Sequence, residues 1–199
     1  MNTATFNKSR QESLDLLHEY TKSAHLIKHA LAVEAGMRWY AGHFKQNPEE
    51  AKMWAICGLL HDFDYESHPD PSPPDGHPFF GVRILGELGF GNEIVEAVLG
   101  HANYSGVPRE SLMAKVLFAV DEISGFITAC ALVRPDKSLS AVQVKSVIKK
   151  MKDKAFAKGC SREDMLAGAE ELGIAIEEHI SNMIEALKPV AEQLGVNPD

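Results

Sequence analysis

Residues 111–133 read SLMAKVLFAVDEISGFITACALV, a long apolar stretch in which Lys115, Asp121 and Glu122 are the only charged residues. Apolar residues recur at helical spacing, so the stretch predicts a largely buried helix. A buried ionised aspartate costs several kcal/mol unless it is paired, hydrogen-bonded or bound to a metal. Asp121 therefore predicts a cationic partner brought by another part of the chain.

Helical spacing dominates the rest of the sequence as well, and no alternating β-branched runs are bounded by hairpin turns. We therefore expect an all-α fold formed by a single domain. Asn92 is expected to cap one helix, Pro78 to lie in a first helical turn, and Pro189 to bend or restart the last helix. The expected helices span residues 8–20, 23–45, 48–60, 78–88, 92–101, 110–133, 140–150, 161–172 and 174–194.

The composition is that of an ordinary globular protein, with 199 residues of which 45% are hydrophobic and 24% are charged. The formal net charge of -8 argues against general nucleic-acid binding. The charge is uneven, because residues 134–162 carry nine Lys and Arg against two Asp, a formal +7 that leaves -15 elsewhere. The composition leaves the oligomeric state open.

Several features favour a soluble cytoplasmic protein. Cys57, Cys130 and Cys160 are widely spaced and form no Cys-x-x-Cys pair, which fits a reducing compartment. Residues 1–10 contain no apolar signal region, and no apolar run approaches the roughly 18 residues of a membrane span. We therefore expect no association with membranes.

One segment is expected to be a loop. Residues 66–78, ESHPDPSPPDGHP, contain five of the ten prolines. Because the segment joins His61-Asp62 to His77, we expect it to lie over whatever site these residues form, where loops commonly control access and selectivity.

Histidine and aspartate residues provide the candidate partners of Asp121. His29 shares an expected apolar stripe with Ala30 and Val33, so its side chain should point inward, whereas His25 has the neighbours of a rim residue. A lone inward histidine is more often a hydrogen-bonded core residue than a metal ligand. His61 and Asp62 end an apolar helix, where the turning backbone can direct both side chains toward one ion.

Imidazole and carboxylate ligands without thiolates suit iron, manganese, cobalt, nickel or zinc, with magnesium also allowed. The residue types therefore indicate a class of divalent metals rather than one particular metal.

In its order of His29, His61-Asp62 and Asp121, the chain resembles the HD-domain superfamily, which is named for the paired His and Asp. The contexts LLHDFDY at 59–65 and LFAVDEI at 117–123 make the resemblance fairly specific. It implies a helical bundle whose metal-binding core covers about 22–130, followed by a C-terminal helical extension at about 134–199. The family's four core metal ligands would be His29, His61, Asp62 and Asp121.

The resemblance also implies further site residues. His77 and His101 match the additional histidines of family members that hold two metals. The structural alternatives are that His77 caps a helix beside Pro78 and that His101 is a favourable cation at a helix C-terminus. Asp64 is a candidate to position water or accept a proton, while a solvated turn carboxylate is the commoner case. After His61-Asp62 comes Phe-Asp-Tyr, so the Gly and Lys of the cyclic-dinucleotide phosphodiesterases are missing.

The basic segment offers cations that could bind a phosphate, although a lysine-rich helix is usually a solvated amphipathic face. The candidate substrate-binding residues there are Arg134, Lys137, Lys145 and Lys149.

The resemblance leaves three functions open. The first is a metal-dependent phosphohydrolase, a phosphatase or phosphodiesterase, in which metal-activated water attacks a small phosphorylated metabolite such as a nucleotide. The second is a di-iron oxygenase that uses the same ligands. The third is a metal-stabilised signalling or scaffold domain without enzymatic activity. A shared fold does not choose among these, and the hydrolase ranks first.

Overall fold

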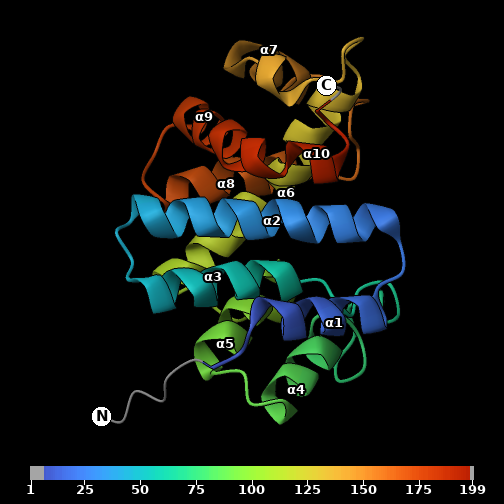
Figure 1. Cartoon of the computed structure of the whole chain (residues 1–199), viewed down its shortest axis with the longest axis vertical. Coiled ribbons are helices and arrows are strands. Elements are labelled where there is room, and N and C mark those ends of the chain that lie inside the picture. Colours follow the sequence, from blue (N-terminus) through green and yellow to red (C-terminus); the bar gives the residue numbers. More distant parts are fainter. Residues whose placement is uncertain (1–6, 198–199) are drawn as a thin grey trace.

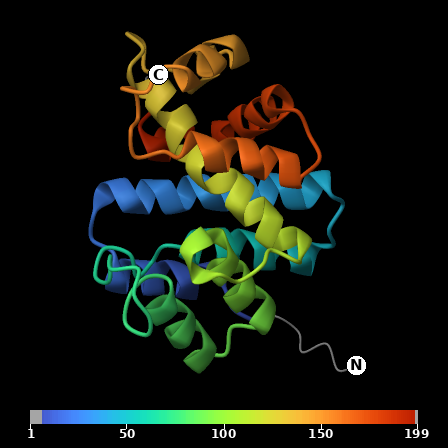
Figure 2. The same ribbon diagram turned by 180° about the vertical axis from the view of Figure 1, so that it is seen from behind.

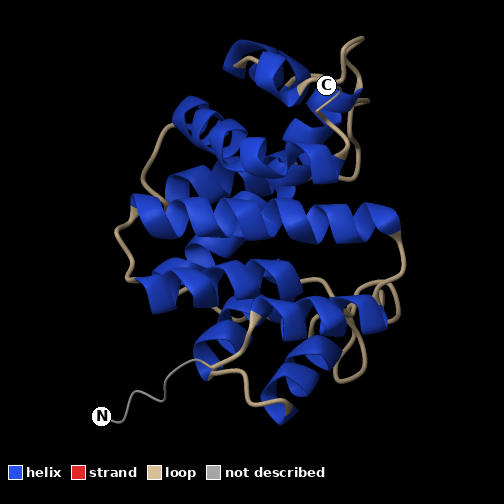
Figure 3. Cartoon of the chain, in the orientation of Figure 1, coloured by secondary structure: helices blue, strands red, loops and turns tan. Residues whose placement is uncertain are grey.

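The computed structural model describes residues 7–197, and within this range every regular element is a helix (Figure 1, Figure 3). The predicted all-α fold is confirmed. No helix in this part of the chain combines the length and apolarity that a membrane span needs. The elements are α1 (Arg10–Tyr20), α2 (Ala24–His43), α3 (Pro48–Leu60), α4 (Phe79–Glu87), α5 (Asn92–His101), η1 (Asn103–Ser105), α6 (Leu112–Leu132), η2 (Leu139–Ala141), α7 (Val144–Met151), α8 (Arg162–Glu171), α9 (Ile176–Leu187), η3 (Lys188–Val190) and α10 (Ala191–Leu194).

Most predicted boundaries agree with these bounds to within a few residues, but two helices differ. The expected helix at 140–150 begins as the short η2, and α7 starts only at Val144. The expected helix at 174–194 is divided around Pro189, as its missing backbone N–H predicts, into α9, η3 and α10. Gly91 rather than Asn92 occupies the N-cap of α5, and Pro78 occupies the N-cap of α4.

Helix α2 lies across the middle of the molecule and separates two groups of helices. Helices α1, α3, α4 and α5 lie on one side of α2, and α7 to α10 lie on the other (Figure 1). Helix α6 crosses α2 obliquely (Figure 2) and packs against both α5 and α8. The side chains of Val120, Phe126 and Ile127 on α6 are fully buried, so α6 contributes to the hydrophobic core of both groups of helices.

The close pairing of α2 and α3 depends on Gly58. A Cβ atom at Gly58 would lie 2.8 Å from Met37 Cγ and 3.0 Å from the carbonyl oxygen of Val33, so a larger residue would push the helices apart. The short connection between the two helices makes them antiparallel. The end of α3, with His61, is therefore held beside the first half of α2, which carries His29.

The start of α2 is fixed by the turn that follows α3. The side chain of Ser23, the N-cap residue, makes no capping hydrogen bond. Instead, Glu66 Oε2 accepts hydrogen bonds from the backbone N–H groups of Lys22 at 2.7 Å and Ser23 at 2.9 Å. Thr21 Oγ1 also donates to the carbonyl oxygen of Phe63 at 2.8 Å. The beginning of α2 and the turn after His61-Asp62 are thus held together.

A buried polar network joins α2, α6 and α9. Tyr40 Oη lies 2.5 Å from His179 Nδ1, and His179 Nε2 lies 2.9 Å from the carbonyl oxygen of Ala119. Burial lowers the pKa of His179 and raises the pKa of Tyr40 to about 12. The tyrosine therefore donates to a neutral histidine, which donates in turn to α6.

This network generates a prediction about pH. Because the pKa of His179 is lower in the folded than in the unfolded protein, the unfolded state binds more protons once the pH falls below about 6.5. His179 should therefore make the protein less stable at pH 5 than at pH 7, since each unit between its two pKa values is worth about 1.4 kcal/mol once the pH lies below both. In denaturant unfolding, His179→Gln should lose less stability than the wild type over this range.

The matched control is His18→Gln, which replaces an exposed histidine of α1. It should keep the wild-type dependence of stability on pH. Equal pH dependence in His179→Gln and the wild type would contradict the assignment of a neutral buried His179.

Candidate metal centre

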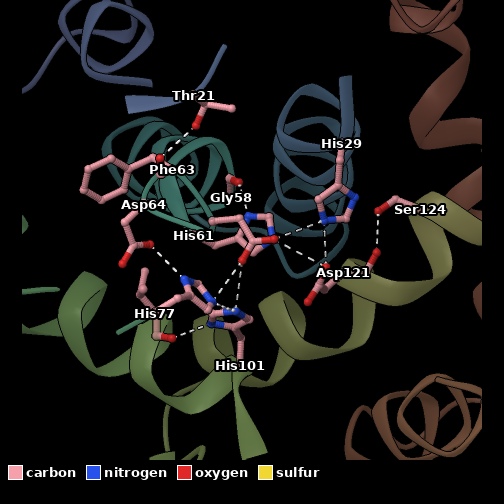
Figure 4. A network of polar contacts seen from close by, with 12 residues as sticks. Thr21, His29, Gly58, His61, Phe63, Asp64, His77, His101, Asp121 and Ser124 are labelled. Atoms are coloured by element: carbon pink, nitrogen blue, oxygen red, sulfur yellow. Dashed lines mark hydrogen bonds and ion pairs between the residues drawn. The ribbon is translucent and has the colours of Figure 1, made fainter. Parts of the chain in front are cut away.

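Five histidine and aspartate side chains from distant parts of the sequence point toward one another (Figure 4), and a sixth, that of Asp62, lies among them with its oxygens 3.2–3.4 Å from the Nε2 atoms of three histidines. Of the six, three lie on helices, two directly follow a helix, and one lies in the loop before α4. They are His29 on α2, His61 and Asp62 at the end of α3, His77 in the loop before α4, His101 at the end of α5 and Asp121 in the middle of α6.

Local backbone geometry directs the histidines at the helix ends. His61 is the C-cap of α3, and the chain continues beyond it in turns that bring Asp62 to the same centre. His61 Nδ1 lies 2.8 Å from the carbonyl oxygen of Gly58, and His101 Nδ1 contacts the carbonyl oxygen of Val98. Because a carbonyl only accepts, each Nδ1 donates and each Nε2 faces the centre as a potential ligand.

One half of the cluster is formed by His29, His61 and Asp121. Asp121 Oδ1 lies 2.9 Å from His29 Nε2 and 3.4 Å from His61 Nε2. The three ligand atoms lie within 4.8 Å of one another, so they could hold a metal ion.

The other half is formed around Asp62. Asp62 Oδ1 lies 3.2 Å from His77 Nε2 and 3.3 Å from His101 Nε2, and these two nitrogens are 3.3 Å apart. Asp62 Oδ2 faces the first half instead, 3.4 Å from His61 Nε2 and 3.8 Å from His29 Nε2. His61, Asp62 and His101 make a second group that could hold a metal ion, and Asp62 presents one oxygen to each half.

The electrostatics of the cluster favour charged carboxylates. Burial opposes the charged forms of Asp62 and Asp121, but the neighbouring histidines outweigh it and hold the pKa of both carboxyl groups well below the usual range. Burial also opposes the charged form of His61, but Asp62 and Asp121 outweigh it and raise the pKa of that imidazole. The two carboxylates therefore attract positive charge, which protons on the imidazoles or a metal ion can supply.

A buried nitrogen tests whether the site suits a metal. His61 Nε2 is buried and has no hydrogen-bond partner among the described residues, although two carboxylate oxygens lie 3.4 Å away. A buried polar atom without a partner calls for a specific explanation, and coordination of a cation between this nitrogen and the carboxylates provides one. Imidazole and carboxylate donors suit a divalent transition metal, so the residues fit such an ion.

The structure separates His29 from its neighbour His25. His25 is exposed and has no contact with the cluster in the described part of the chain, as its rim-like sequence context predicts.

Asp64 lies behind His77 rather than among the converging ligands. Its side chain is 1% exposed, and its Oδ1 is 2.8 Å from His77 Nδ1. Its Oδ2 accepts a hydrogen bond of 2.7 Å from the backbone N–H of Gly81. Asp64 is therefore not the solvated turn carboxylate that is common at such positions, and both of its oxygens already have partners.

The basic candidates lie apart from the cluster. Arg134 pairs with Asp136 at 2.9 and 2.8 Å, and Lys137 follows in the same exposed turn. Lys145 and Lys149 lie on α7, which packs against α6 and α9 across α2 from α3 and α5 (Figure 1). No hydrogen bond or ion pair within residues 7–197 joins any of the four to the cluster.

Two further side chains near the cluster carry no clear signal in the sequence. Tyr104 donates from its hydroxyl to the carbonyl oxygen of His77 at 3.2 Å, and burial together with Asp62 and Asp64 raises its pKa to about 12. Burial and the neighbouring Asp121 raise the pKa of Glu122 to about 7. A lone tyrosine in a short 3₁₀ turn has no distinguishing pattern, and Glu122 reads only as one more charge on α6.

Comparison with known families gives one match. A family model described as HD domain matches residues 26–125, about half of the chain, and this range includes all six residues of the cluster. No match was found among curated proteins or among solved structures.

Removing Asp121 tests the candidate ligand set. We expect Asp121→Ala to purify with far less bound metal than the wild type, because the variant loses a carboxylate that faces two imidazoles. Elemental analysis after dialysis measures the metal content. Asp136→Ala, which removes an exposed carboxylate paired with Arg134, should retain the wild-type content. Full metal occupancy in Asp121→Ala would refute the assignment of Asp121 as a ligand.

Proposed function

We propose that the protein is a metal-dependent phosphohydrolase that acts on a small phosphorylated metabolite. A nucleotide is one substrate of this class. The chain belongs to the HD-domain family, whose members are commonly metal-dependent hydrolases. The observation that carries the proposal is the buried His61 Nε2, which lies 3.4 Å from the carboxylates of both Asp62 and Asp121 without a hydrogen-bond partner in the described residues. A divalent cation at this point would satisfy all three side chains.

The donor set defines the class of metal. His29, His61, Asp62 and Asp121 are the proposed core ligands, and His77 and His101 are the proposed additional ligands of a second ion. None of the three cysteines belongs to either candidate group among the described residues, so a thiolate site is not part of the proposal. Bound iron, manganese, cobalt, nickel or zinc would lower the pKa of a bound water, polarise a phosphoryl oxygen and offset developing negative charge.

The exposure of the side chains indicates where a substrate enters. The side chains of His29, Asp62 and Asp121 are 17%, 21% and 18% exposed, whereas that of His61 is fully buried and those of His77 and His101 are 4% and 6% exposed. We therefore infer that a phosphate group approaches over His29, Asp62 and Asp121, while the other histidines form the closed floor of the site.

The protein's own groups prepare this site in two ways. Backbone carbonyl groups hold the Nδ1–H of His61 and His101, so each imidazole keeps its Nε2 lone pair directed to the centre. Tyr104 keeps its hydroxyl proton at neutral pH, because its pKa is about 12, and donates it to the backbone carbonyl of His77. We infer that this hydrogen bond helps to hold the loop that carries His77 beside the site.

The proposal is tested by metal analysis of the purified protein followed by a panel of phosphomonoesters and phosphodiesters. We expect bound divalent metal and release of phosphate or of a phosphomonoester from at least one substrate. Asp62→Ala should lower this activity by at least about 100-fold, because losing a direct ligand costs at least as much as losing a residue that supports one. Asp136→Ala should keep wild-type activity.

The alternative functions predict different results in the same experiment. Oxygen consumption by an iron-loaded protein, without hydrolysis of any phosphate ester, would contradict the proposal and support a di-iron oxygenase. Bound metal without turnover of any substrate would support a metal-stabilised signalling or scaffold domain.

A further inference from the structure

The histidines of the candidate metal centre are held in different ways. His61 and His101 each donate from Nδ1 to a backbone carbonyl three residues earlier, so their orientation is set within their own helices. His77 belongs to no helix, and its Nδ1 contacts a carboxylate, that of Asp64, at 2.8 Å. The orientation of this one imidazole therefore depends on a charged side chain from elsewhere in the chain.

Two hydrogen-bond donors hold the side chain of Asp64 in place. Its carboxylate is buried and accepts from His77 Nδ1–H through Oδ1 and from the backbone N–H of Gly81 through Oδ2. Two hydrogen bonds of 2.8 and 2.7 Å offset the cost of burying this charge. Asp64 thus ties both His77 and the beginning of α4 to the turn that follows His61-Asp62.

Gly81 leaves the space that this arrangement needs. A Cβ atom at residue 81 would lie 2.7 Å from Asp64 Cγ and 2.8 Å from each carboxylate oxygen. Any larger residue would displace the carboxylate or the start of α4. A substitution at Gly81 therefore offers a second, independent way to displace the Asp64 side chain while residue 64 remains an aspartate.

The proline-rich loop brings His77 to the site but does not orient its ring. Within the loop, His68 stacks on Phe80 with ring centroids 3.7 Å apart, and its carbonyl oxygen accepts from the backbone N–H of His77 at 2.7 Å. These contacts fix the backbone. Among the described residues, the Asp64 carboxylate is the group that contacts the Nδ1 side of the His77 ring.

We propose that Asp64 is a positioning residue that makes His77 a ligand of the second of two metal ions. A carboxylate at Nδ1 keeps the proton on that nitrogen, leaves the Nε2 lone pair facing Asp62 and His101, and makes the imidazole a stronger donor. This role rests on the proposed metal centre. It differs from the water-positioning or proton-accepting role that the sequence predicts for Asp64.

The two halves of the centre should then respond differently to substitution. His29, His61 and Asp121 lie on or directly after helices, and no hydrogen bond or ion pair among the described residues joins their side chains to that of Asp64. The half around Asp62, His77 and His101 depends on Asp64. Removing the Asp64 carboxylate should therefore weaken the binding of one ion and leave the other unchanged.

Isothermal titration calorimetry of the metal-free, full-length protein with Mn²⁺ tests whether the two ions depend differently on Asp64. We expect two ions per wild-type chain. In Asp64→Asn, an amide NH₂ group replaces one of the two carboxylate oxygens, which accept from His77 Nδ1 and from the backbone N–H of Gly81. The affinity for one of the two Mn²⁺ ions should therefore fall about 10- to 100-fold. Asp75→Asn makes the same chemical change at an exposed carboxylate of the same loop and should bind two ions as the wild type does.

Gly81→Ala provides the independent test, and it also serves if Asp64→Asn does not fold. It should reproduce the selective loss of one ion, as should His77→Ala. Gly86→Ala places a methyl group on α4 where no atom outside the local helix backbone lies within 4 Å, and it should keep both ions. Thermal unfolding of each variant verifies that it is folded.

The outcomes separate this inference from the proposed function. A wild-type chain that binds no metal would contradict both. A wild type that binds a single ion would overturn the role of Asp64 only. Two ions bound with wild-type affinity in folded Asp64→Asn or Gly81→Ala, or equal weakening of both ions, would also overturn this role and leave the proposed function standing.

Discussion

The attraction between two partly buried carboxylates and the imidazoles around them is the interaction on which the rest of this structure depends. Asp62 and Asp121 lie on different elements, and each faces His61 Nε2 at 3.4 Å. Burial alone would disfavour these charges, so the fold must bring positive groups to them. Helices α2, α3, α5 and α6 all contribute a side chain or a terminus to this point, which explains why they pack around one centre.

Apolar packing supplies the rigidity that this arrangement requires. The close approach of α2 and α3 at Gly58 holds His29 beside His61, and the buried face of α6 carries Asp121 to the same place. His77 lies in the loop before α4, outside the helices, and there the Asp64 carboxylate contacts both His77 Nδ1 and the backbone N–H of Gly81. In the proposed two-metal centre, helix packing would fix one half and the hydrogen bonds of Asp64 would fix the other, so the two ions would depend on different residues.

Much of this was predictable because it rests on short-range patterns. Helical spacing predicted the all-α fold and the inward direction of His29, and a carboxylate in an apolar helix indicated that Asp121 needs a partner. The position of Asp64 behind His77 was not predictable, because it depends on how a proline-rich loop returns to the turn after α3. The placement of Lys145 and Lys149 across α2 from the cluster likewise depends on the packing of α7, about which an amphipathic pattern says nothing.

Anomalous diffraction from crystals grown with Mn²⁺ tests the central claim most directly, because it locates each ion among named side chains. The account predicts two anomalous peaks in the cluster, one among His29, His61 and Asp121 and the other among Asp62, His77 and His101. Crystals of the Mn²⁺-treated protein that show no peak within this cluster, with His61 Nε2 still lacking a partner, would contradict it.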